Sequence, residues 1–139
     1  KRFDLGDSTF MKELICITCP MGCHLSIDSD ERGELKVTGN RCIRGEQYAR
    51  EEVLNPKRVV TYTCEALFPE DFSLTAGSEL VHRVPVRTTN AFPKERIPEL
   101  IATLRTMNIR LPVARGDMVI KDALGTGIDV IVTRTIALE

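Results

Sequence analysis

The sequence lacks an excess of charge of either sign, a long apolar run and an apolar leader. Its 19 basic and 20 acidic residues leave a formal charge of -1, so no overall field draws it to nucleic acid or to an anionic membrane. No apolar run approaches the ~20 residues of a membrane-spanning helix, and the first residues lack the apolar core of a secretion signal. We therefore expect a cytoplasmic protein with no transmembrane segment and no nucleic-acid partner.

The sequence also lacks an obvious catalytic constellation. Its two histidines, His24 and His82, are not accompanied by the nucleophile and acid that a catalytic triad requires. Gly125-Thr-Gly127 precedes a strand-like segment, which favours a tight turn over a phosphate-binding loop. We therefore expect no substrate chemistry from the chain itself.

Four cysteines form the most informative pattern that is present. Cys16, Cys19 and Cys23 lie within eight residues, and Cys42 follows after a gap of 18 residues. Three clustered thiols and a distant fourth are typical of the ligands of an iron-sulfur cube. Five cysteines would leave one unpaired in a disulfide framework, which a reducing compartment also disfavours. The spacing therefore predicts a metal centre.

Other uses of these thiols remain open on spacing alone. Structural zinc is usually held by two separated pairs of ligands, so the spacing favours iron without excluding zinc or free redox-active thiols. His24 is an alternative fifth ligand, although its place directly after Cys23 favours exposure to solvent. Cys64 lies outside the quartet; we interpret it as a buried strand cysteine, with a reactive thiol as the alternative.

The hydrophobic pattern divides the chain into two lobes, residues 11–58 and 59–139. In the first, a hairpin over 24–38 and a turn at Gly39-Asn40 return the chain to place Cys42 beside the other cysteines, and a helix over 45–54 ends at Asn55-Pro56. In the second, strands are expected at 59–62 and 81–87, with Pro85 at an edge or bulge. Residues 65–80 are expected to form a loop or an irregular hairpin.

Apolar residues at intervals of three and four then predict a helix over 93–108, with Pro98 in its first turn. Later strands are expected around Val113, 118–120 and 128–132. The fold class is α+β: a small β-rich cysteine lobe, followed by an α+β domain with one main helix packed on a few strands and a role in partner docking.

Residues 14–60 resemble the N-terminal iron-sulfur domain of molybdopterin-dependent oxidoreductases. They share its Cys-x2-Cys-x3-Cys pattern, the glycine before the third cysteine, the Gly-Asn turn and the basic residue and glycine after the fourth cysteine. The resemblance implies a 4Fe-4S cluster held by Cys16, Cys19, Cys23 and Cys42, with Arg44 beside it. The chain is too short for pterin-binding domains, so molybdenum catalysis is not implied.

The chain from Met11 onward resembles a family of small CxxC-motif-containing proteins of unknown function. The shared features are the cysteine set, Val84-Pro-Val-Arg-Thr88, Pro93-Lys-Glu-Arg-Ile-Pro98 and Leu124-Gly-Thr-Gly127. The resemblance implies an association with an FAD-dependent dehydrogenase or another flavoprotein. We therefore expect an iron-sulfur electron-transfer subunit; the alternative is a zinc-stabilised structural or assembly module without redox activity.

Local charge around the fourth cysteine agrees with a redox role. Residues 41–58 hold five cations and three carboxylates, an excess of two positive charges. Cations near a cluster stabilise its more negative, reduced form. The alternative is that these charges are simply the solvated face of a helix.

Overall fold

The computed structural model describes residues 10–73 and 81–138, and the chain divides into two units. The N-terminal unit is Lys1–Pro56 and the C-terminal unit is Lys57–Glu139; the division falls two residues before the boundary that the sequence suggested. Each unit has its own hydrophobic core. The fold is a mixture of strands and helices, so the predicted α+β class is confirmed. None of the described helices is long and apolar enough to cross a membrane.

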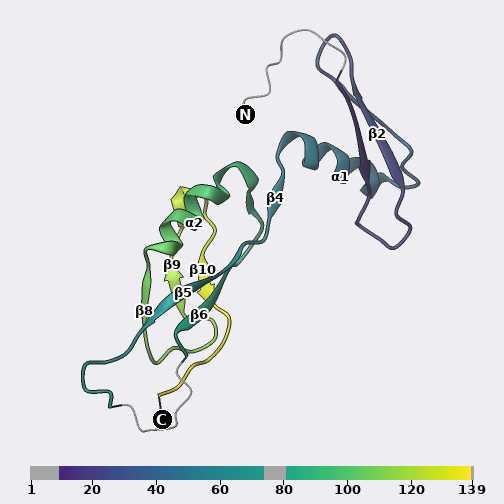
Figure 1. Cartoon of the computed structure of the whole chain (residues 1–139). Coiled ribbons are helices and arrows are strands. Elements are labelled where there is room, and N and C mark those ends of the chain that lie inside the picture. The colour runs from purple at the N-terminus through teal and green to yellow at the C-terminus, as the bar shows by residue number, and fades with distance from the viewer. Residues whose placement is uncertain (1–9, 74–80, 139) are drawn as a thin grey trace. The chain divides into compact units, whose positions relative to one another are not determined.

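The N-terminal unit is a three-stranded antiparallel sheet covered by one helix. Strands β1 (Met11–Ile15), β2 (His24–Ser29) and β3 (Leu35–Thr38) follow one another in space as in sequence, and helix α1 (Ile43–Leu54) packs on β2 and β3 (Figure 1). Leu25 and Ile27 alternate along β2 and are fully buried, as expected for a strand with one face on a core. The predicted hairpin over 24–38 is confirmed.

Helix α1 ends where the sequence predicted and begins two residues earlier. The Asn55 N–H donates to the Glu51 carbonyl at 2.8 Å, and Pro56 has no N–H with which to continue the helix. Within the helix, the Arg50 guanidinium lies 2.9 Å from the Glu46 carboxylate. The four-residue spacing of this pair therefore forms the ion pair that such spacing favours in a helix.

The C-terminal unit is built on a five-stranded sheet in the order β8-β5-β6-β10-β9. The strands in that order are Asn108–Arg110, Thr61–Leu67, Arg83–Thr88, Val130–Val132 and Met118–Ile120. Neighbours are antiparallel except β5 and β8, which are parallel. A second small sheet pairs β4 (Lys57–Arg58) with β7 (Phe92–Pro93), and short 3-10 turns occupy Lys94–Arg96 and Ala123–Gly125.

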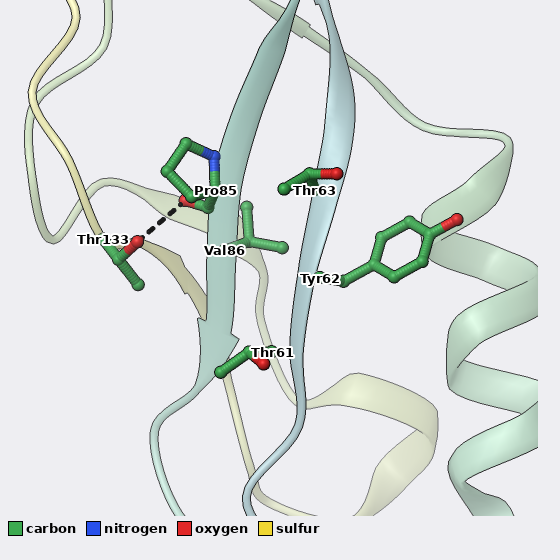
Figure 2. Close-up of a pocket in the computed structure, with 6 residues that line it drawn as sticks. All are labelled: Thr61, Tyr62, Thr63, Pro85, Val86 and Thr133. Carbon is green, nitrogen blue, oxygen red and sulfur yellow. Dashed lines mark hydrogen bonds between the residues drawn. The ribbon is translucent and has the colours of Figure 1, made fainter.

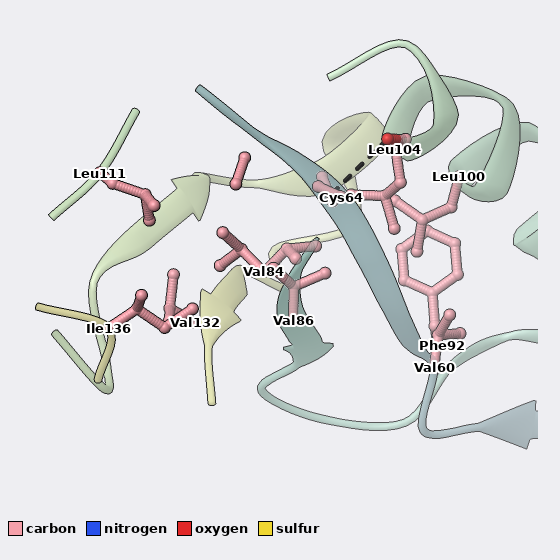
Figure 3. Close-up of a cluster of buried hydrophobic side chains, with 13 residues drawn as sticks. Val60, Cys64, Val84, Val86, Phe92, Leu100, Leu104, Leu111, Val132 and Ile136 are labelled. Atoms are coloured by element: carbon pink, nitrogen blue, oxygen red, sulfur yellow. Dashed lines mark hydrogen bonds between the residues drawn. The ribbon is translucent and has the colours of Figure 1, made fainter. Parts of the chain in front are cut away.

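Helix α2 (Ile97–Arg105) packs on β5 and closes the core of this unit (Figure 3). The predicted apolar stripe is confirmed, because Leu100 and Leu104 are buried against the sheet. Pro98 occupies the first turn, where its missing N–H removes no helical bond. Cys64 is a buried residue of β5 whose thiol lies 3.5 Å from the Leu104 carbonyl, so its interpretation as a core cysteine is confirmed.

One prediction about this unit is wrong in detail. The helix expected to reach residue 108 ends at Arg105, because Asn108 pairs with Glu65 as the first residue of β8. Strand β5 extends to Leu67 and pairs antiparallel with β6, in agreement with the irregular hairpin expected as one of two alternatives over 65–80; residues 74–80 lie outside the described residues. A sequence pattern does not reveal such pairing between distant segments.

The expectation that Pro85 marks an edge or a bulge is also wrong. Strand β6 is interior, with β5 on one side and β10 on the other. The last pair between β10 and β6 is Val132 with Val86, so Pro85 lies one position past it. The Pro85 carbonyl accepts hydrogen bonds from the Thr133 N–H at 3.0 Å and from the Thr133 hydroxyl at 3.2 Å (Figure 2). In an antiparallel sheet the N–H and the carbonyl of one residue point to the same neighbouring strand. The N–H that Pro85 lacks would point to the side of β10, and β10 has already ended at Val132, so no hydrogen bond of that strand is lost.

Candidate metal centre

Three of the four candidate ligands lie on the loop between β1 and β2. Cys16 directly follows β1 and Cys23 directly precedes β2, whose first pair is Ile15 with His24. The Cys16 N–H donates to the Cys23 carbonyl at 2.8 Å and closes the loop. Cys16 and Cys23 are therefore the first and last residues of this loop, and Cys19 lies between them.

These three thiols have different surroundings. Cys16 is only 4% exposed and belongs to the small core with Leu25 and Ala49, and its sulfur lies 3.0 Å from the Thr18 hydroxyl. Cys19 and Cys23 are half-buried. The hairpin thus fixes Cys16 most firmly and leaves Cys19 and Cys23 partly open to solvent.

The topology of the sheet returns Cys42 to the same end. Strand β3 runs antiparallel to β2 and ends at Thr38, opposite Ser26, so the chain leaves the sheet beside the cysteine loop. Gly39 follows with a φ of +85°, and a Cβ there would lie 2.0 Å from the His24 carbonyl oxygen. Only glycine satisfies both this conformation and this close approach. Gly39 therefore allows the tight turn that follows β3; the placement of Cys42 beside the other three thiols remains a prediction.

Cys42 is exposed and occupies the N-cap position of α1. Its carbonyl accepts hydrogen bonds from the Gly45 N–H at 3.1 Å and from the Asn40 side-chain amide at 3.2 Å. The backbone N–H of Gly45, followed by the backbone N–H and guanidinium of Arg44, lowers the pKa of the Cys42 thiol. A helix N-terminus and a neighbouring cation both favour a thiolate, which is the form that binds metal.

The four thiols share one end of the sheet without forming a ready ligand set. Among residues 10–73 and 81–138, no three histidine, cysteine or acidic side chains are close enough to hold one metal ion. The donor set fits an iron-sulfur cube in kind, since it offers four sulfurs and one of them already favours the thiolate. To bind one centre, the thiols would have to come closer together than they lie in this structure.

The residues around this end were only partly foreseen. Arg44 lies exposed in the first turn of α1, next to Cys42 as expected. His24 is exposed, in agreement with its interpretation as a surface residue. Sequence reasoning missed the contact of Thr18 with Cys16, for which the only signal was a hydroxyl inside the Cys-x2-Cys segment.

Two shallow hollows among the described residues of the C-terminal unit are further candidate sites. The first, of about 390 Å³, is lined by Thr61, Tyr62, Thr63, Pro85, Val86 and Thr133 (Figure 2). The second, of about 450 Å³, includes Arg110 and Asp117, but the Asp117 carboxylate accepts the Ala114 N–H at 2.8 Å and so stabilises a turn. We assign chemistry to neither hollow.

Comparison with known proteins identifies the family. A family model described as protein of unknown function (DUF1667) matches residues 43–134. The chain belongs to this family. The expected membership of a family of unknown function is thereby confirmed, and the motifs at 84–88, 93–98 and 124–127 lie inside the matched range. The DUF1667 match begins directly after Cys42, so it does not include the four candidate ligands.

One solved structure is similar over part of this DUF1667 protein. It is the NMR structure of Clostridium perfringens protein CPE0013, a structural genomics target, with 20% sequence identity and a TM-score of 0.47. The match covers 60% of this chain and 87% of that chain. The search of curated proteins found no match.

Proposed function

We propose that the protein is an iron-sulfur electron-transfer subunit of a cytoplasmic flavoprotein, such as an FAD-dependent dehydrogenase. Cys16, Cys19, Cys23 and Cys42 would hold a 4Fe-4S cluster, which supplies the capacity to take up and release one electron. The observation that carries the proposal is topological. The cysteine loop and the N-cap of α1 lie at the same end of one small sheet, so four thiols from two distant segments can serve one centre.

The surrounding residues have distinct roles in this proposal. The backbone hydrogen bond from Cys16 to Cys23 would hold two of the ligands in place. The amides of Gly45 and Arg44 favour the thiolate of Cys42, and the Arg44 guanidinium would favour the more negative state of a reduced cluster. Residues 57–139 would provide the docking domain for the flavoprotein.

The small size of the N-terminal core supports a bound metal and also keeps a second function open. Among the described residues, that core has five buried members: Cys16, Leu25, Ile27, Leu35 and Ala49. Units of this size usually need a metal or another cross-link for stability. A structural zinc on the same four thiols would meet that need, so the second candidate is a zinc-stabilised assembly module without redox activity.

Anaerobic purification followed by iron, zinc and acid-labile sulfide analysis separates the two candidates. Near four irons and four sulfides per chain, with an absorption spectrum that bleaches on dithionite, is the result expected for the electron-transfer subunit. One zinc without sulfide would identify the assembly module instead. Metal-free protein with a dithiol that cycles between reduced and oxidised states would overturn both.

A further inference from the structure

Four large apolar side chains are exposed around the cysteine end of the N-terminal unit. Ile15 ends β1, Ile17 and Met21 lie on the cysteine loop, and Ile43 begins α1. Their exposed fractions are 56%, 75%, 61% and 65%. We refer to these four residues as the apolar collar. Exposed apolar residues gathered at one site mark an interaction surface more often than a solvated one.

The exposed charged residues beside Cys42 are cationic, whereas Glu13 is exposed on β1 near Ile15. Arg41 and Arg44 flank Cys42 and are exposed, and no ion pair joins either of them to a carboxylate of the described residues. The nearby Glu46 is already bound by Arg50 at 2.9 Å. On the side of Cys42 the collar is therefore bordered by positive charge that no described carboxylate neutralises, which matches a partner surface that carries carboxylates there.

We propose that the apolar collar is a docking surface for a second protein whose contact face has an apolar centre bordered by carboxylates. Identification of that protein as the flavoprotein rests on the proposed function, in which residues 57–139 already contact it and the collar would be a second contact; the docking surface itself does not rest on that function. Met and Arg are enriched in interfaces, and a small apolar contact with a charged border is typical of transient redox encounters. Such a contact excludes water next to the thiols and forms faster at low ionic strength.

The same unit supplies matched control residues. Met11 and Leu54 are 72% and 70% exposed, so they resemble the collar in chemistry and in exposure. Met11 lies four residues from Ile15 along β1, about 13 Å away, and Leu54 lies eleven residues from Ile43 along α1, about 16 Å away. If the partner recognises the location of the collar and not apolar exposure in general, it should not contact Met11 or Leu54.

The test places a photo-crosslinking benzoylphenylalanine at position 17, 43, 11 or 54 of the full chain, in cells that naturally produce it. We expect positions 17 and 43 to link to one and the same second protein, with a yield at least tenfold above positions 11 and 54. The linked peptide should carry Asp or Glu beside apolar residues. Equal yields at all four positions, links to residues 1–9 of the same chain, or links to a second copy of the chain would each overturn the proposal.

Affinity measurements with the purified linked protein complete the test. Ile17→Ser and Ile43→Ser should each raise the Kd about tenfold, while Met11→Ser and Leu54→Ser should change it less than twofold. Arg41→Glu should reduce the association rate and its salt dependence, whereas Arg32→Glu, in the turn at the opposite end of the sheet, should not.

Iron analysis of the same variants separates this proposal from the proposed function. Collar variants that keep the wild-type iron content and lose binding support the docking surface. A chain without any cluster that still binds through the collar would remove the electron-transfer function and leave the docking surface intact. Unchanged affinity in both isoleucine variants would overturn the docking surface whatever the iron content.

Discussion

Gly39→Ala should destabilise the N-terminal unit far more than the same change at another glycine with a similar backbone. Gly39 and Gly33 both have positive φ, +85° and +77°. A Cβ at residue 33 would meet nothing within 4 Å, whereas a Cβ at residue 39 would lie 2.0 Å from the His24 carbonyl oxygen. The pair therefore separates the cost of the left-handed backbone from the cost of the clash.

The two costs can be estimated from the structure. A left-handed backbone costs an alanine about 1–2 kcal/mol, and both variants share this term. At residue 39 the backbones must also separate by more than an ångström, which resembles overpacking and adds about 1–3 kcal/mol. We expect Gly33→Ala to lower the free energy of unfolding by about 1–2 kcal/mol and Gly39→Ala by about 2–5 kcal/mol.

Urea titration followed by the amide resonances of Leu25 and Ile27 measures this difference within the N-terminal unit. Both residues are buried in β2, so their signals report the unit and not the whole chain. Gly39→Ala should also reduce the iron content of anaerobically purified protein, because the clash displaces the segment that brings Cys42 back to the loop. Equal destabilisation by the two alanines, with equal iron content, would refute the close approach at Gly39 and its role.

Three further predictions address individual residues. Cys42→Ser should lose the cluster while Cys64→Ser keeps it, by iron analysis; equal loss in both would overturn the choice of ligands. Thr88→Val should cost about 1–3 kcal/mol by urea titration, because the buried Thr88 hydroxyl accepts the Val60 N–H at 3.0 Å, and Thr88→Ser should retain most of that stability. In metal-free protein, iodoacetamide should alkylate Cys42 at lower pH than in the unfolded chain, because its folded pKa is lowered. Cys64, whose pKa burial raises, should react only on unfolding, and equal rates for both thiols would contradict this difference.

Local signals in the sequence were sufficient for much of the fold. The turn composition of residues 28–33 and the flanking alternation gave the β2–β3 hairpin, and Asn55-Pro56 gave the end of α1. The spacing of Leu100 and Leu104 gave the buried face of α2. Each of these features depends on residues within about one turn or one hairpin, which is the range over which sequence patterns determine structure.

Features set by distant partners were missed. Strand β8 exists because Asn108 pairs with Glu65, more than forty residues away. Pro85 is tolerated inside the sheet because β10 ends opposite it, and the sequence of β6 contains no sign of that. The hairpin predicted that the chain returns to the end of the sheet that carries the cysteine loop, but the orientation of the four thiols could not be predicted, because side-chain direction depends on packing.

X-ray absorption at the iron and zinc edges of anaerobically prepared full-length protein tests the central claim most directly. The account predicts iron surrounded by four sulfur atoms, with a second shell of neighbouring irons, and loss of that second shell in Cys42→Ser. A zinc atom with four sulfur neighbours and no iron, or a protein with neither metal, would contradict it.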